Sequence, residues 1–143
     1  MKKRGIIYVA TNPSYHALKV GKTDRSSPAP RLKELFTTGV PDPFDCAYAA
    51  IVEDNTEVEK YFFKRYEKRR SWFSREFYYV TVPTAIKALK PFEIEDITVF
   101  TREEIDALLS DKQKEMRKAE RERLKVMRPS AVASKNAHRL IRA

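Results

Sequence analysis

Four side chains in the first sixty residues carry groups suited to acid–base, anion-binding and metal-binding chemistry. The phenol of Tyr8 has an ordinary pKa near ~10, too high for a base at neutral pH, and a nearby ammonium such as Lys19 would favour the phenolate. Arg31 offers a fork of donors for two phosphate oxygens, and Glu59 a hard oxygen ligand for Mg²⁺. Together they suit hydrolysis of a phosphodiester, provided that folding gathers them into one site that solvent reaches.

Runs of β-branched and aromatic residues predict the strands that would carry the first two groups. Residues 5–10 are typical of a buried strand, and the turn residues Asn12 and Pro13 lead to a second strand over 18–21. Further strands are expected over 44–52 and 76–82.

Helix signals lie between these strands. Prolines at 28 and 30 favour a helix start before Arg31, and the residues at 54–56 offer an N-cap for a helix over about 57–70. A helix is also expected over 83–89, and Thr101 with Glu104 forms a capping box for a charged helix that Pro129 must stop. We therefore expect an α/β (α+β) fold, a small mixed sheet of three to four strands flanked by helices, plus a C-terminal charged helix.

Composition excludes several classes of protein. Of the 143 residues 42% are hydrophobic and 11% aromatic, which excludes wholesale disorder. The single cysteine, Cys46, excludes an internal disulfide scaffold and a cysteine-based zinc site, and it favours a reducing, cytoplasmic location. The apolar runs are too short for a membrane span, which takes about 20 residues, so no membrane association is expected.

The excess positive charge is concentrated at the C-terminal end. Residues 1–110 hold 18 basic and 16 acidic side chains, whereas residues 111–143 hold 11 basic and 4 acidic ones. A net charge of +9 in so small a protein points to a polyanionic partner, with nucleic acid favoured and DNA expected.

Several short motifs follow one another in a fixed order. They are Gly5-Ile6-Ile7-Tyr8, Lys19-Val20-Gly21, Arg31, the segment 37–41, Glu59 and Arg75-Glu76-Phe77. This ordered set resembles the GIY-YIG nuclease superfamily, and within it the branch named for a phage T5 reading frame and a fungal meiotically upregulated gene. The resemblance covers roughly residues 4–90.

The resemblance implies a metal-dependent endonuclease. Tyr8, Lys19, Arg31 and Glu59 fall at catalytic positions; Glu59 is the implied ligand of Mg²⁺ or Mn²⁺, Glu76 is a lesser candidate, and no small-molecule cofactor is implied. It also implies a nuclease domain over 1–92. The charge distribution adds a connecting segment and charged helix over 93–128 and a basic tail over 129–143, which we expect to be disordered.

Further basic side chains, one of them in the last of these motifs, are expected to contact the nucleic acid. They are Lys22, Arg69, Arg70, Arg75, Lys118, Arg121 and Lys125. The aromatic residues Trp72 and Phe73 lie among them and could stack on a base.

Alternative interpretations remain open for these residues. Tyr8 could be a core aromatic, Lys19 could point outward from a half-exposed strand, and Glu59 could belong to a solvated helix face. Leu35 and the Phe62-Phe63 pair stand where family members often carry histidine, which keeps open a catalytically weak nucleic-acid-binding protein or a structural and interaction protein on the same fold. The oligomeric state is left open.

Overall fold

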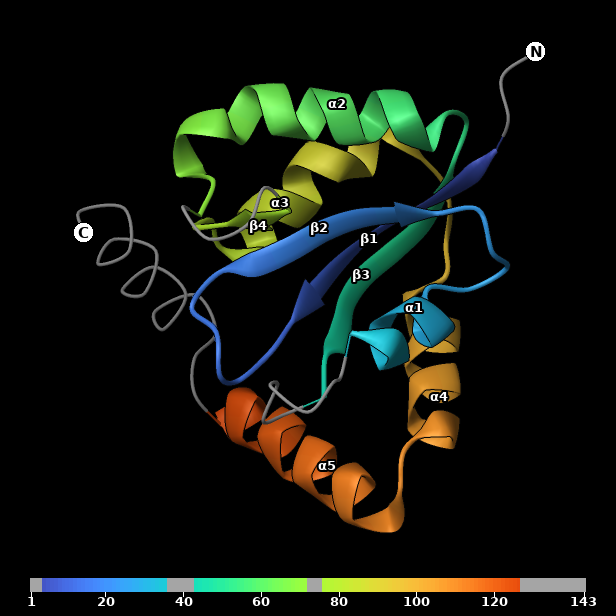
Figure 1. Ribbon diagram of the computed structural model, residues 1–143, viewed down its shortest axis with the longest axis vertical. Coiled ribbons are helices and arrows are strands. Elements are labelled where there is room, and N and C mark those ends of the chain that lie inside the picture. Colours follow the sequence, from blue (N-terminus) through green and yellow to red (C-terminus); the bar gives the residue numbers. More distant parts are fainter. Residues whose placement is uncertain (1–3, 36–42, 72–75, 127–143) are drawn as a thin grey trace.

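The computed structural model describes residues 4–35, 43–71 and 76–126, and its centre is a five-stranded antiparallel sheet (Figure 1). The strands are β1 (Gly5–Thr11), β2 (Leu18–Thr23), β3 (Asp45–Val52), β4 (Phe77–Tyr78) and β5 (Glu93–Asp96), in the order β4-β2-β1-β3-β5. The predicted α/β class is confirmed. The sheet differs from the expected one in having five strands and only antiparallel pairs.

Strand β1 occupies the centre of the sheet because its side chains are apolar on both faces. Ile7 and Val9 belong to one buried cluster, whereas Ile6, Tyr8 and Ala10 belong to a second. Since successive side chains of a strand point to opposite faces, each face needs its own cover of helices.

The helices supply that cover in two layers (Figure 1). Helices α2 (Asn55–Tyr66) and α3 (Val82–Leu89) pack on the face of Ile7, and α1 (Ala29–Glu34) and α4 (Thr98–Leu108) pack on the face of Tyr8. Short 3₁₀ turns, η1 (Glu67–Arg69) and η2 (Lys90–Phe92), follow α2 and α3. Helix α5 (Asp111–Val126) follows α4, and no helix of the described residues is long and apolar enough to cross a bilayer.

Two strands differ from their expected extents. The strand expected over 76–82 is limited to Phe77–Tyr78, because Thr81 accepts a hydrogen bond from the amide of Thr84 and begins α3. Strand β5 was not predicted, since three of its four residues are acidic and the segment lacks the run of β-branched and aromatic residues that is typical of a strand. It pairs with β3, so the sheet continues past residue 92.

The capping box expected at Thr101 and Glu104 is wrong. Thr101 is buried inside α4 and its hydroxyl donates to the carbonyl of Ile97. The chain instead has a reciprocal pair at Ser110 and Gln113, where each side chain accepts a hydrogen bond from the other residue's amide. This pair starts a new helix, so the single charged helix expected up to Pro129 is divided into α4 and α5; Pro129 itself lies outside the described residues.

Helix α5 is attached to the sheet by two arginines that converge on one carboxylate. Arg117 is buried and donates to Asp45 at 2.8 Å and to the carbonyl of Phe44. Arg121 donates twice to Asp45, at 2.8 and 3.0 Å, and once to Asp106 at 3.0 Å. We refer to these residues as the Asp45 cluster. The nucleic-acid role expected for Arg121 does not fit these contacts, because its guanidinium is engaged within the protein.

Candidate functional site

Tyr8 lies at the middle of β1, directly opposite Gly21 of β2. A Cβ placed on Gly21 would lie 2.6 Å from the Tyr8 hydroxyl oxygen and 2.7 Å from Cζ, so the bare backbone of the glycine leaves room for the ring. Tyr8 is only 1% exposed. The interpretation of Tyr8 as a core aromatic therefore describes its packing, and the solvent-exposed phenol expected from the sequence is not found.

Gly21→Ala is expected to destabilise the fold by about 1–3 kcal/mol, because the added methyl group overlaps the Tyr8 ring and hydroxyl. In a double-mutant cycle with Tyr8→Phe, measured by urea denaturation, the double variant should lose less stability than the sum of the two single losses, since removing the hydroxyl relieves part of the overlap. Strictly additive losses would show that the glycine is needed for another reason.

Lys19 is buried on the same face of the sheet, two residues before Gly21. Its side chain is 1% exposed, its ammonium forms an ion pair with Glu76, and it lies 5.8 Å from the centroid of the Phe77 ring. A buried ammonium needs a charged partner, and Glu76 supplies it. The interpretation in which Lys19 points outward to solvent is wrong.

Arg31 reaches Tyr8 from the first turns of α1. This short helix begins where Ser27 accepts a hydrogen bond from the amide of Ala29, with Pro30 in its first turn. The side chain of Arg31 is 45% exposed; its guanidinium lies 3.7 Å from the carboxylate of Glu34 and also forms a hydrogen bond with the Tyr8 hydroxyl. The side chain is thus partly exposed to solvent while it contacts the phenol.

The phenol of Tyr8 stays protonated at neutral pH. Burial raises its pKa to about 12; the charge and hydrogen bond of Arg31 oppose this rise, and the charges of Glu76 and Glu59 add to it. The cation that acts on Tyr8 is Arg31 and not Lys19, which is bound to Glu76. The expectation that Lys19 lowers the pKa of Tyr8 is therefore wrong.

Glu59 is positioned by the anchored start of α2. Asp54 caps this helix. The side-chain Nδ2 of Asn55 donates to the backbone carbonyls of Ile6 and Thr23, which fixes the first turn against β1 and β2. Glu59 follows one turn later and is half-buried. Although α2 packs on the face opposite Tyr8, the charge of Glu59 interacts with residues of β2 and with Glu76 beside β4.

The carboxyl group of Glu59 has a raised pKa. Burial is the main cause; the charge of Lys22 opposes the rise, Glu76 adds to it, and Lys19 opposes it. Glu59 and Glu76 are therefore close enough for their charges to repel each other. Such a pair gains from a cation placed between or beside the two carboxylates.

Glu59 and Glu76 are the two carboxylates of this cluster that could hold a metal ion. No group of three or more His, Cys, Asp or Glu side chains suited to a metal occurs in the part of the chain that the structure describes. Mg²⁺ is commonly bound through one or two carboxylates while it keeps several waters, and Glu59 with Glu76 could supply these. Either carboxylate would be a hard oxygen ligand.

The other basic residues expected to bind nucleic acid are scattered. Lys22 is exposed and interacts with Glu59, Arg69 is exposed on η1, and Lys118 is exposed on α5. Arg70 lies 4.5 Å above the ring of Phe63. The remaining candidates, Arg75 and the side chain of Lys125, lie outside the described residues, as do the aromatic residues at 72 and 73.

The sequence did not predict the full role of two residues near this site. Glu76 was only a lesser metal candidate, yet it pairs with Lys19 and acts on both Tyr8 and Glu59. Tyr78 is buried, and burial together with the charge of Glu59 raises its pKa to about 12, partly opposed by Arg70. The signal for both was the Glu-Phe-Tyr sequence of the motif that includes β4.

Comparison with known proteins identifies the family of the domain that contains these residues. A family model described as the T5orf172 domain matches residues 5–93, a range that includes Tyr8, Lys19, Arg31, Glu59 and Glu76. Searches of curated proteins and of solved structures find no match. Since the matched range covers more than half of the chain and all of these residues, the chain belongs to the T5orf172 family, whose GIY-YIG-like domains are nuclease-like or associated with nucleic acid.

Proposed function

We propose that this protein is a metal-dependent endonuclease that hydrolyses phosphodiester bonds, with DNA as the favoured substrate. The observation that carries the proposal is the electrostatic coupling of Tyr8 with Arg31, Glu59 and Glu76, which come from separate elements of the matched domain. Family membership alone supports only a nuclease-like or nucleic-acid-associated domain, whereas a cation, a phenol and two carboxylates acting on one another suit the handling of a phosphate group.

Each residue of the cluster has a distinct role in this proposal. Arg31 binds phosphate oxygens with the exposed part of its guanidinium, while Tyr8, which remains protonated, holds that guanidinium in place. Glu76 is a positioning residue that pairs with the buried ammonium of Lys19. Glu59, assisted by Glu76, would hold Mg²⁺ or Mn²⁺, which when bound would neutralise phosphate charge and stabilise the leaving oxygen.

A cleavage assay on supercoiled plasmid tests the proposal. The full chain should produce nicked or linear DNA in the presence of Mg²⁺ or Mn²⁺, and a chelator should stop the reaction. Absence of products with both metals across neutral and mildly alkaline pH would contradict endonuclease activity on DNA, and the same assay on RNA would extend the test to the other nucleic acid.

The burial of Tyr8 favours a second candidate function, binding of nucleic acid without cleavage. Tyr8 is only 1% exposed, so its phenol is not an exposed proton-transfer group. Leu35, one turn after Arg31, has no group that can transfer a proton. Binding through the basic residues would then weaken steeply as salt is raised, since phosphate contacts release counterions. Salt-sensitive binding with no cleavage in either metal would establish this function in place of the first.

Glu59→Gln is expected to raise the stability of the fold at neutral pH. A carboxyl group whose folded pKa is raised binds its proton more tightly in the folded state, so ionisation costs stability as pH rises through and above the ordinary carboxyl pKa. Thermal unfolding should therefore show a higher midpoint for Glu59→Gln at pH ~7 and no difference below pH ~4. The matched control is Glu57→Gln, an exposed acid of the same helix, and a lower midpoint for Glu59→Gln at neutral pH would contradict the account.

A further inference from the structure

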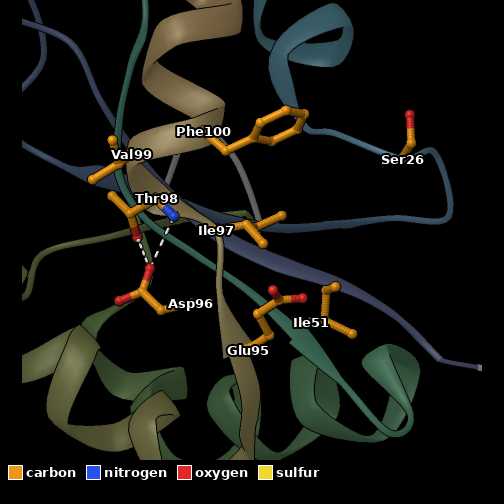
Figure 2. A pocket seen from close by; sticks show the side chains of 8 residues that line it. All are labelled: Ser26, Ile51, Glu95, Asp96, Ile97, Thr98, Val99 and Phe100. Carbon is orange, nitrogen blue, oxygen red and sulfur yellow. Dashed lines mark hydrogen bonds between the residues drawn. The ribbon is translucent and has the colours of Figure 1, made fainter.

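A second feature of the surface lies beside β5 and does not include the residues of the proposed site. It is an open hollow of about 510 Å³ (Figure 2). Its lining residues come from β3, β5, the start of α4 and the connection between β2 and α1: Ser26, Ile51, Glu95, Asp96, Ile97, Thr98, Val99 and Phe100. We refer to it as the β5 hollow.

The β5 hollow has an apolar part that is unusually exposed. Val99 is 69% exposed and Phe100 is 49% exposed, and Figure 2 shows Phe100 with Ile97 and Ile51 around the opening. Large apolar side chains gathered at one exposed place are a common feature of interaction sites.

The surroundings of this apolar part are acidic. Residues 93–106, which include β5 and most of α4, hold six acidic side chains and one basic side chain, Arg102, which donates to the carbonyl of Cys46. The carboxylate of Asp96 already accepts a hydrogen bond from the amide of Thr98 and forms an ion pair with Lys90. Glu95 and Glu103 are exposed, and neither forms an ion pair with another described residue. A ligand for this hollow should therefore be both apolar and basic.

The C-terminal segment of this chain has that composition. Residues 127–143 contain four basic side chains and no acidic one, and they include the sequence Arg139-Leu140-Ile141-Arg142, an apolar pair flanked by two cations. We propose that residues 139–142 dock in the β5 hollow, with Leu140 and Ile141 against Val99 and Phe100 and with the arginines near Glu95 and Glu103. This proposal is independent of the proposed nuclease activity.

Chain length and charge both permit this docking. The residues between Val126 and Arg139 can span about 40 Å when extended, which is comparable to the full width of a folded body whose radius of gyration is roughly 14 Å. Pairing of β5 with β5 of a second copy is disfavoured, because three of its four residues are acidic and would face like charges. The same charges attract a basic segment.

Paramagnetic NMR on the full chain tests the docking. A nitroxide is attached to Ala143→Cys, since the native Cys46 is buried and protected from labelling, and the amide signals are compared before and after reduction of the label. We expect selective broadening of the signals of residues 95–100. Mixing spin-labelled and isotope-labelled chains tests the source of the segment: broadening that persists in the mixed sample would show docking from a second copy and would overturn docking within one chain.

A pair of charge-reversal variants provides the control. Glu95→Lys should remove at least about half of the selective broadening, whereas Glu57→Lys, at an exposed position on α2, should leave it unchanged. Broadening spread evenly over the molecule, broadening centred elsewhere, or equal responses of the two variants would overturn the proposal.

Discussion

Replacement of Arg31 by alanine is expected to reduce metal-dependent cleavage by about 10²–10³-fold, the usual cost of removing one donor that stabilises charge in a transition state. Arg31 is half exposed and contacts Tyr8, so it is the cation of the cluster placed to bind phosphate while remaining anchored to the protein. Single-turnover cleavage of a plasmid or short duplex, at saturating metal, measures this effect on the chemical step.

Two further variants make the Arg31 experiment specific. Arg31→Lys keeps the charge but loses the planar fork of donors, so it should recover only a small part of the lost rate. Lys33→Ala removes an exposed cation from the same helix and should leave the rate near that of the wild type. Equal losses for Arg31→Ala and Lys33→Ala would indicate that α1 contributes only general positive charge.

Asp45→Asn is expected to cost about 3 kcal/mol of stability, the largest loss predicted for the fold. This carboxylate accepts hydrogen bonds from Arg117 and Arg121, and its removal leaves the buried guanidinium of Arg117 without its charged partner. Urea denaturation measures the loss. Hydrogen exchange at the amides of α5 should show that this helix separates from the sheet before the rest of the domain unfolds.

The pH dependence of the Asp45 cluster gives an independent test. Burial alone would raise the pKa of Asp45, but the hydrogen bond from Arg121 and the charges of both arginines lower it below its usual range. Its contribution is therefore fully present above an ordinary aspartate pKa and is lost as pH falls through the lower, folded value. Asp45→Asn should abolish that acid-sensitive part of the stability.

A surface ion pair provides the matched comparison for Asp45. Arg4 and Glu53 lie 3.4 Å apart with both side chains more than half exposed, so Glu53→Gln should cost less than about 1 kcal/mol. A loss for Asp45→Asn as small as that for Glu53→Gln would show that the Asp45 cluster does not hold α5 in place.

The elements that carry the site could be predicted from the sequence because their signals are local. The apolar run of β1, the short β2 strand and the prolines before α1 each indicate one structure, and the structure has all three within a few residues of the expected bounds. Glu59 was likewise expected on a helix, and the structure confirms this. The helix begins two residues earlier than predicted, because Asp54 caps it and the side chain of Asn55 donates hydrogen bonds to backbone carbonyls of β1 and β2.

The rest depends on contacts between segments far apart in the sequence. That Lys19 is buried and pairs with Glu76, 57 residues later, follows from the register of β2 with β4 and has no local signal. The burial of Tyr8 likewise depends on α1 and α4 covering its face of the sheet. The break between α4 and α5 was missed because the true capping pair, Ser110 and Gln113, was less conspicuous than Thr101 and Glu104.

The most direct test of the proposed metal site is a titration of the full chain with Mn²⁺, in which electron paramagnetic resonance measures the ion that stays free. The proposal is that Glu59, assisted by Glu76, holds one divalent cation. We predict one saturable Mn²⁺ site in the wild type and in Glu57→Gln, and its loss in Glu59→Gln. Equal Mn²⁺ binding by all three proteins, or no binding by the wild type, would contradict the claim.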